Sequence, residues 1–228
     1  MIPVSEIFYS IQGEGRYSGY PSVFVRVGGC NLKCPGFGEK GCDSYYAVDG
    51  RFRNEWKLMS VEEIIKEVGK FAEHRPHLVI TGGEPMLYYR ELYELVKNFD
   101  GLVGIETNAT IDVDFEEFEE YKNVVFAMSV KLANSGEKYE KRVKKEVIRN
   151  YAKNAKKSFF KFVVSNECKE EIEDITKGCD LEIFCMPLGA SKEELEKNAP
   201  FVFEFCLKNG YRYSDRLHIR LFGKKKGV

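Results

Sequence analysis

Three cysteines lie within thirteen residues of the chain, at Cys30, Cys34 and Cys42, in the spacing C-x3-C-x7-C. Thiolates are soft ligands that suit iron–sulfur clusters and zinc. Three of them can hold three irons of a 4Fe-4S cluster and leave the fourth iron open to a small molecule. The alternative is a zinc site or a set of packed free thiols, although no fourth Cys or His lies between Cys42 and His74. The cysteines alone favour neither interpretation.

Two stretches before the cysteines carry further groups that could bind a ligand. The segment Gln12-Gly13-Glu14-Gly15 offers an amide and a carboxylate, and its glycines allow close backbone approach. A surface turn is the simpler interpretation of this segment. Arg26 lies in an apolar stretch that is predicted as a strand, where a charge needs a partner. That partner is either structural or an anionic substrate, and the residues do not decide between them.

Short apolar strands alternate with amphipathic helices along the chain. Strands are predicted at residues 22–27, 78–80, 102–105, 124–128, 159–164, 181–185 and 217–221. Helices are predicted after two capping boxes, Ser60 to Glu63 and Ser191 to Glu194, and over residues 87–99, 115–121, 139–151 and 167–176. This alternation predicts βαβ units with right-handed crossovers and a parallel sheet.

Polar or glycine-rich groups recur where the predicted strands end, at Cys30, Thr81, Glu106, Ser129 and Met186. In parallel α/β folds the carboxyl ends of the strands carry the active site. The residues alone therefore predict a parallel α/β fold with a metal site at that edge of the sheet.

Composition excludes several classes of protein. The 228 residues suffice for one sizeable core, and we expect a single domain over residues 1–228. The formal net charge of −1, from 35 basic and 36 acidic residues, gives no reason to expect nucleic acid or a membrane surface as partner. There is no signal-peptide pattern and no apolar run long enough to span a membrane. Seven cysteines, an odd number with three clustered, argue against a disulfide framework and for a reducing cytoplasm.

The cysteine loop follows the strand predicted at residues 22–27, and Thr81-Gly82-Gly83-Glu84-Pro85 follows the strand predicted at residues 78–80. Together these two segments resemble the radical S-adenosylmethionine (SAM) superfamily, whose usual cysteine spacing is C-x3-C-x2-C. Within it the chain resembles the 7-carboxy-7-deazaguanine synthase family of the 7-deazapurine (queuosine and archaeosine) pathway. The shared pieces are residues 6–15, Phe24-Val25-Arg26, Gly29-Cys30-Asn31-Leu32, Cys42-Asp43-Ser44, residues 81–86, Ile105-Glu106-Thr107-Asn108 and Ser129-Val130-Lys131.

This resemblance implies a fold, a reaction and its cofactors. The fold would be an incomplete parallel (β/α) barrel of about six strands, a modified radical SAM core. The reaction would be a lyase step that converts 6-carboxy-5,6,7,8-tetrahydropterin to 7-carboxy-7-deazaguanine with loss of ammonia. The cofactors would be a 4Fe-4S cluster, SAM and Mg²⁺. The partners would be the pterin substrate, an external electron donor of the flavodoxin or ferredoxin type, and a second copy of the chain in a homodimer.

The resemblance also assigns roles to residues, with no catalytic side chain beyond the cluster and SAM. Cys30, Cys34 and Cys42 would ligate the cluster, and Ser44 would bind Mg²⁺. Contacts to SAM would come from Gly41, Cys42, Asp43, Gly83, Ser129, Val130, Lys131, Met186, Pro187, Leu188 and Gly189. Contacts to the substrate would come from Ile11, Gln12, Gly13, Arg26, Thr81 and the C-terminal Val228, with Glu106, Asn108 and His218 as secondary candidates.

Two alternatives to this enzyme remain open from the sequence. One is a radical SAM activase that installs a glycyl radical on a partner protein, although it would need neither Arg26 nor the segment from Gln12 to Gly15. The other is a non-enzymatic α/β binding module that zinc stabilises.

Overall fold

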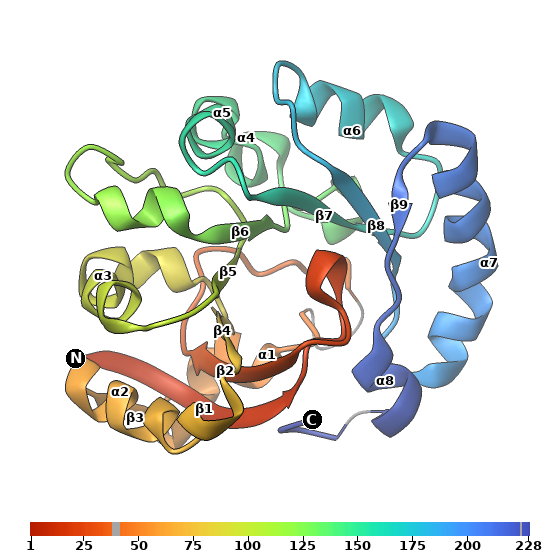
Figure 1. The fold of residues 1–228 in the computed structure, drawn as a ribbon. Coiled ribbons are helices and arrows are strands. Elements are labelled where there is room, and N and C mark those ends of the chain that lie inside the picture. The colour runs from red at the N-terminus through yellow and green to blue at the C-terminus, as the bar shows by residue number, and fades with distance from the viewer. Residues whose placement is uncertain (38–41, 224) are drawn as a thin grey trace.

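The strands of the computed structural model, which describes residues 1–37, 42–223 and 225–228, form one curved sheet (Figure 1). Within these residues the strand order is β3-β1-β2-β4-β5-β6-β7-β8-β9. The bounds are β1 Ile2–Ile11, β2 Pro21–Val27, β3 Lys57–Met59, β4 His77–Gly82, β5 Val103–Thr107, β6 Val125–Met128, β7 Phe159–Val164, β8 Ile183–Pro187 and β9 Arg212–Tyr213.

The strands from β2 through β9 pair in parallel, except for β3, which lies on the far side of β1. Six of these parallel strands are of ordinary length, and β9 contributes two residues. The sheet does not close on itself, so the prediction of an incomplete parallel barrel of about six strands is confirmed. The prediction did not include β1 and β3, which pair antiparallel and extend the sheet beyond β2.

Helices surround the outer face of the sheet (Figure 1). Their bounds are α1 Tyr45–Val48, α2 Val61–Gly69, α3 Tyr89–Asn98, α4 Tyr139–Arg142, α5 Lys145–Asn154, α6 Lys169–Thr176, α7 Lys192–Asn209 and α8 Leu217–Phe222. Short 3-10 turns lie at Gly15–Tyr17, Gly50–Glu55, Ala72–His74, Pro85–Tyr88, Glu119–Asn123 and Ala133–Ser135. The capping box at the start of α2 is present, because Ser60 accepts from the Glu63 N–H and the Glu63 carboxylate accepts from the Ser60 N–H.

The buried apolar residues form two clusters, and neighbouring residues of β6 alternate between them, so the clusters lie on opposite faces of the sheet. The larger cluster lies between the sheet and the helices and takes residues from almost every element. The smaller one consists of Val125, Ala127, Phe159 and Phe184, with Tyr17 packed against it. Strands that are covered on both faces have continuous apolar sequences, which is why these strands could be predicted from the sequence.

Among the described residues, the open edge of the barrel is bridged by hydrogen bonds between two loop segments rather than by another strand. The N–H of Leu217 donates to the Gly13 carbonyl oxygen at 3.1 Å, and the N–H of Gly15 donates to Ser214 Oγ at 2.7 Å. The segment after β1 thereby joins the segment after β9. This brings the beginning and the end of the chain to the same cavity.

The prediction of a strand at residues 217–221 is wrong, because this segment is helix α8. Leu217, Ile219 and Leu221 alternate with polar residues as in a strand, but only Ile219 is buried. Among the described residues no strand pairs with this segment, so its alternating side chains have no sheet to pack against and a short helix forms instead.

Two helix predictions were also partly wrong. The helix expected over residues 139–151 is divided into α4 and α5, because the backbone at Val143 is extended and its side chain is buried. The helix expected over residues 115–121 is a turn followed by the 3-10 turn Glu119–Asn123.

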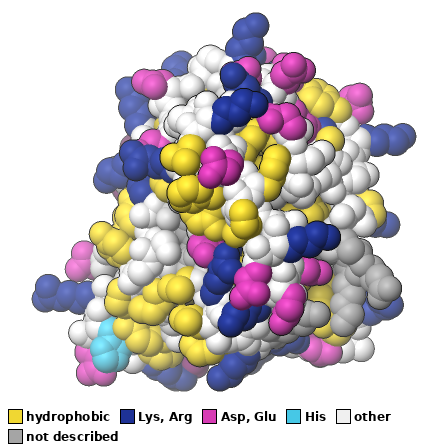
Figure 2. Space-filling model, turned by 90° about the vertical axis from the view of Figure 1, so that its right-hand side faces the viewer, with side chains coloured by type: hydrophobic (Ala, Val, Ile, Leu, Met, Phe, Trp, Pro, Cys, Tyr) yellow, Lys and Arg dark blue, Asp and Glu magenta, His cyan; other side chains and the backbone are white. Residues whose placement is uncertain are grey.

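The side of the molecule that carries α7 and α8 presents apolar side chains among mixed charges (Figure 2). The exposed ones on these helices are Phe201, Phe203, Leu207, Leu221 and Phe222. Among the described residues, no helix combines the length and the apolar character needed to cross a membrane.

Candidate active site

The register of the sheet brings side chains from several of the parallel strands to a common cavity. Arg26 of β2 pairs with Thr81 of β4, and Val163 of β7 pairs with Met186 of β8. These four residues line a cavity of about 510 Å³ at the carboxyl edge of the parallel strands. Glu106 of β5 and Ser129 after β6 line the same cavity. The prediction that strand-end groups meet at this edge is therefore confirmed for Thr81, Glu106, Ser129 and Met186.

The three clustered cysteines line this cavity as well. All three are free thiols. Burial raises the pKa of Cys30 to about 11, and it also raises the pKa values of Cys34 and Cys42. A buried thiol with a raised pKa is a poor nucleophile, but a bound metal removes its proton outright. The environment therefore suits metal ligands better than reactive cysteines.

The cysteine loop is held by the segment after β6. The Glu137 carboxylate accepts from the backbone N–H of Lys33 at 2.5 Å and from that of Cys34 at 3.1 Å. The N–H of Gly36 donates to the Ser135 carbonyl oxygen at 2.8 Å. A Cβ atom at Gly36 would lie 2.2 Å from the Asn134 carbonyl oxygen, so only glycine allows this contact.

The glycine-rich end of β4 packs directly against the other end of the cysteine loop. A Cβ atom at Gly83 would lie 1.9 Å from the Gly29 carbonyl oxygen. Gly82 has φ +132°, a conformation that favours glycine. The N–H of Glu84 donates to the Gly29 carbonyl oxygen at 2.8 Å. These contacts fix the position of Cys30 at the cavity wall.

The carboxylate of Glu84 is structural. It is fully buried and accepts from Thr107 Oγ1 at 2.7 Å and from the N–H groups of Asn108 and Met86 at 2.7 and 3.0 Å. Burial raises its pKa, although these donors oppose that effect. Glu84 thus ties the end of β4 to the end of β5 rather than facing a ligand.

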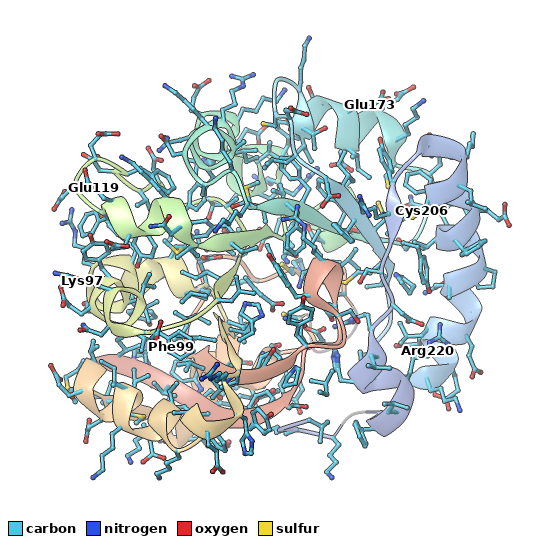
Figure 3. All side chains as sticks on the ribbon, viewed as in Figure 1. Lys97, Phe99, Glu119, Glu173, Cys206 and Arg220 are labelled. Atoms are coloured by element: carbon cyan, nitrogen blue, oxygen red, sulfur yellow. The ribbon has the colours of Figure 1, made fainter. Side chains whose placement is uncertain are left out.

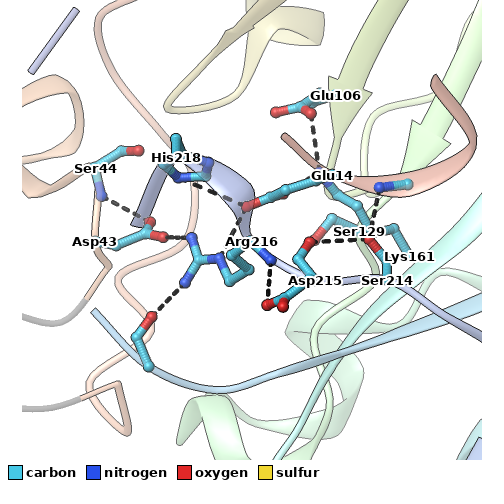
Figure 4. Close-up of polar contacts among 12 residues, drawn as sticks. Glu14, Asp43, Ser44, Glu106, Ser129, Lys161, Ser214, Asp215, Arg216 and His218 are labelled. Carbon is cyan, nitrogen blue, oxygen red and sulfur yellow. Dashed lines mark hydrogen bonds and ion pairs between the residues drawn. The ribbon is translucent and has the colours of Figure 1, made fainter. Parts of the chain in front are cut away.

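A buried cluster of charges crosses the floor of the cavity (Figure 4). Lys161 Nζ donates to Glu14 Oε2 at 2.8 Å and to Glu106 Oε1 at 2.9 Å. Thr81 Oγ1 donates to Glu106 Oε2 at 2.8 Å. Burial opposes ionisation of both carboxyl groups, but Lys161 keeps their pKa values below the usual range. The same two carboxylates raise the pKa of Lys161.

Arg216 extends this cluster to the cysteine loop (Figure 4). Its Nε donates to Glu14 Oε1 at 2.8 Å, and its other guanidinium nitrogens donate to the Gly189 carbonyl oxygen and to Asp43 Oδ2. Arg216 lowers the pKa of Asp43 although burial opposes this. His218 Nε2 lies 3.9 Å from Glu14 Oε1. Residues 14, 43, 189 and 216, which are far apart in the sequence, therefore form one ionic wall.

Arg26 has the structural partner that its burial requires. Its Nε donates to Glu6 Oε1 at 2.7 Å, and Tyr46 Oη donates to the same carboxylate oxygen at 2.8 Å. Another guanidinium nitrogen of Arg26 donates to Ser44 Oγ at 3.2 Å. The remaining edge of Arg26 lines the cavity. The two options for this residue, a structural partner or a substrate, are thus compatible.

Most of the predicted site residues line the cavity. These are Ile11, Gln12, Gly13, Arg26, Cys30, Cys34, Cys42, Asp43, Ser44, Thr81, Gly83, Ser129, Lys131, Met186, Leu188, Gly189 and Val228, and the secondary candidates Glu106, Asn108 and His218. Val130 and Pro187 are not among the lining residues, and Val130 is buried in the core between sheet and helices. Gly41 lies outside the described residues.

Lys161 and Arg216 line the cavity but were missing from the predicted site. Lys161 carried a signal, because a lysine between Phe160 and Phe162 in an apolar strand needs a partner, as Arg26 does. The sequence around Arg216 gave no comparable signal. This residue lies in a short polar segment whose contacts depend on the helix that the sequence had predicted as a strand.

The zinc alternative requires its ligands around a single point. Within residues 1–37, 42–223 and 225–228, no three His, Cys, Asp or Glu side chains are arranged in that way. In an iron–sulfur cluster each cysteine binds a different iron, so the ligands need only face a common space.

Comparison with known proteins identifies the family of the chain. The model of the radical SAM superfamily matches residues 24–177. The 7-carboxy-7-deazaguanine synthase of Halobacterium salinarum is 32% identical over 245 residues, covering 97% of this chain and 90% of that protein. The synthase of the same name from Pyrobaculum aerophilum is 34% identical over 235 residues, covering 99% and 97%. The chain belongs to the 7-carboxy-7-deazaguanine synthase family of the radical SAM superfamily.

Solved structures agree with this family at the level of the fold. QueE from Escherichia coli superposes with a TM-score of 0.71 at 23% sequence identity, covering 95% of this chain and 94% of that one. SuiB from Streptococcus suis, in a structure bound to S-adenosylmethionine, gives a TM-score of 0.56 at 14% identity, covering 82% of this chain and 48% of that one.

Membership of the radical SAM superfamily implies a 4Fe-4S cluster and SAM, and the cavity fits both. Three free thiols line one space, and the backbone of Gly83, which packs against Gly29 beside Cys30, lines it as well. Lys131 lines the same part of the cavity, and its charge opposes the raised pKa values of all three thiols. The residues present are therefore compatible with a cluster and a bound SAM.

Proposed function

We propose that this protein converts 6-carboxy-5,6,7,8-tetrahydropterin to 7-carboxy-7-deazaguanine with loss of ammonia, in the biosynthesis of 7-deazapurines such as queuosine or archaeosine. The observation that carries the proposal is one cavity lined both by Cys30, Cys34 and Cys42 and by the polar wall of Gln12 and Arg26. Near full-length relatives that are named 7-carboxy-7-deazaguanine synthase support it.

In this proposal the cysteines hold the cluster, which together with SAM supplies the one-electron chemistry. SAM would contact residues that line the cavity beside the cysteines, namely Asp43, Gly83, Ser129, Lys131, Met186, Leu188 and Gly189. The pairing of Lys131 Nζ with Ser129 Oγ at 2.9 Å leaves the lysine without a carboxylate partner among the described residues, so its charge is available to an anionic group. The carboxylate of SAM is such a group.

The substrate would contact the opposite wall. Arg26 is held by Glu6, so its planar guanidinium is already oriented to receive a carboxylate. Gln12 and Thr81 would meet the pterin edge, which needs amide and hydroxyl partners. The C-terminal Val228 lines the cavity and would close over the substrate.

We also propose that Mg²⁺ binds between the substrate and Ser44. A hard cation prefers oxygen ligands, and Ser44 Oγ lies next to the carboxylate of Asp43, which accepts from the Ser44 N–H at 2.8 Å. Arg26 donates to that hydroxyl, which leaves the second lone pair of the oxygen for the ion.

We further propose that residues 1–228 form a single domain, that the protein is cytoplasmic and that it forms a homodimer. The exposed apolar side chains of α7 and α8 are available for contact with a second copy of the chain.

The direct test is turnover by the anaerobically reconstituted protein. With the carboxylated pterin, SAM, Mg²⁺ and dithionite, we expect 7-carboxy-7-deazaguanine and ammonia in equal amounts, in excess over the methionine released from SAM. Mass spectrometry of the product and an ammonia assay measure this. Cleavage of SAM without conversion of the pterin would contradict the proposal and favour another radical SAM reaction.

We further propose that the external electron donor, of the flavodoxin or ferredoxin type, docks over the cysteine loop. Lys33, which precedes Cys34, is exposed, as are Lys138, Lys141 and Lys144 around α4. The Glu137 carboxylate joins the two segments by accepting from the backbone of Lys33 and pairing with Lys141 at 3.2 Å. A basic surface one residue from a proposed cluster ligand suits an acidic redox protein.

Charge reversal tests this surface. For the triple variant Lys33→Glu, Lys138→Glu and Lys144→Glu, we expect a loss of about tenfold in turnover driven by an acidic flavodoxin at low salt, because steering is lost. Turnover driven by dithionite should stay unchanged. Reversal of the exposed residues Lys153, Lys156 and Lys157 is the matched control. Equal losses with both reductants would contradict docking at this surface.

A further inference from the structure

The ring nitrogens of the buried residue His77 have no hydrogen-bond partner among the described residues. His77 begins β4 and is 5% exposed. Buried polar side chains are almost always hydrogen-bonded, to protein or to ordered water. Burial lowers the pKa of His77 to about 4, so the ring is neutral at pH 7, with one nitrogen as donor and the other as acceptor.

A second, small cavity lies against this histidine. Its volume is about 20 Å³, enough for one water molecule and too small for anything larger. The cavity depends on Gly104 of β5, because a Cβ atom there would lie 2.7 Å from His77 Nε2. The ring of Tyr17 meets the imidazole edge-on at 5.2 Å and also lines the cavity.

Polar side chains take part in the lining of this small cavity. Besides His77 they include Gln12, Glu14, Glu106 and Lys161. These four residues also line the large cavity that contains the candidate site. The ring of His77 and the charged cluster therefore border the same small space. Dry cavities are lined by apolar groups alone, whereas a buried water needs two to four polar partners.

We propose that the small cavity binds one water molecule that hydrogen-bonds His77 to the cluster of Glu14, Glu106 and Lys161. Through this water His77 acts as a positioning residue for the cluster. The cluster faces the large cavity on its other side, so its orientation affects how tightly the pterin binds. This last step rests on the proposed function, whereas the water site does not.

The water itself is tested by a high-resolution crystal structure of the reconstituted protein. We expect one ordered water within about 3.2 Å of a His77 nitrogen and of a polar atom of Gln12, Glu14, Glu106 or Lys161. A dry cavity would overturn the proposal. This result does not depend on which reaction the protein catalyses, so it stands apart from a failure of the proposed function.

The positioning role is tested by two substitutions at one residue. His77→Phe removes both ring nitrogens, and we expect the KM for the pterin to rise about tenfold, while SAM cleavage in the absence of pterin is unchanged. His77→Gln keeps a donor and an acceptor, and it should stay within about threefold of the wild type. His74→Phe, at an exposed histidine, is the control. An unchanged KM in His77→Phe, or equal effects of Phe and Gln, would overturn the role. If His77→Phe does not fold, the proposal is tested by the KM of His77→Gln for the pterin and by the presence of the ordered water in the crystal structure.

Discussion

Replacing Cys42 with alanine is expected to abolish the iron–sulfur cluster and all turnover of the pterin. An open cluster has only three protein ligands, and no fourth cysteine lines the cavity among the described residues that could replace a lost one. Cys30→Ala and Cys34→Ala should have the same effect. The measurements are the visible absorbance and the iron and sulfide content after anaerobic reconstitution.

The remaining cysteines provide controls matched in chemistry. Cys168 and Cys179 are partly exposed. Cys185 of β8 and Cys206 of α7 are buried in the core between sheet and helices, and Figure 3 labels Cys206. None of the four lines the cavity, so their alanine variants should keep the absorbance. Full absorbance in Cys42→Ala, or its loss in Cys168→Ala, would refute the ligand assignment.

The sequence allowed the location of the site to be predicted better than its internal contacts. Thr81, Glu106, Ser129 and Met186 could be placed at one edge because the ends of parallel strands meet there whatever the partners are. The apolar runs that precede these residues specify the strands, since both faces of the sheet are covered. Such local patterns are sufficient to predict a parallel α/β fold with a site at its carboxyl edge, whereas the prediction of a partial barrel came from the family resemblance.

The ion pairs could not be predicted, because they join residues that the chain brings together only when folded. Lys161 and Glu14 are 147 residues apart, and Arg216 and Glu14 are 202 apart. The sequence shows that a charge in an apolar strand needs a partner, but not which carboxylate supplies it. Glu84 shows the same limit, because its place in a glycine-rich strand end does not reveal that Thr107 and Asn108 hold its carboxylate.

The helix at residues 217–222 explains the largest error in the predicted fold. Five residues of alternating polarity are too few to distinguish a strand from a helix when only one of them is buried. Because of the same error, Arg216 was missing from the predicted site. Arg216 directly precedes α8, and its guanidinium group pairs with Glu14 and Asp43. An error in one short element thus removed a central residue from the predicted site.

Replacing Lys161 with methionine is expected to destabilise the protein by about 3–5 kcal/mol at neutral pH, because it leaves buried carboxylates without their cation. Lys161 is 4% exposed and lies between Glu14 and Glu106, at 2.8 and 2.9 Å. Arg216 still pairs with Glu14 in this variant, so the uncompensated charge falls mainly on Glu106. The midpoint of urea unfolding under anaerobic conditions measures the loss. The exposed Lys156, changed to methionine, is the control and should stay within about 0.5 kcal/mol of the wild type.

The pH dependence of this loss gives the sharper test, because its sign follows from the pKa shifts. In the wild type the pKa values of Glu14 and Glu106 are lowered, so their contribution to stability is present above about pH 4.3 and is lost as the pH falls through the lowered values. The pKa of Lys161 is raised, so its contribution is fully present below about pH 10.4. The stability of the wild type should therefore change little, through these groups, between about pH 8 and about pH 6.

In Lys161→Met the burial of Glu106 remains and its cation is gone, so the pKa of this carboxyl group should rise above its ordinary value. The folded variant then binds more protons than the unfolded chain, and its stability should increase as the pH falls from about 8 to about 6. The difference in the free energy of unfolding between the variant and the wild type should therefore become smaller over that range. If this difference stays constant or grows as the pH falls, Lys161 does not compensate the charge of Glu106. If the variant is less stable than the wild type by under about 1 kcal/mol at the higher pH, the buried ion pairs themselves are contradicted.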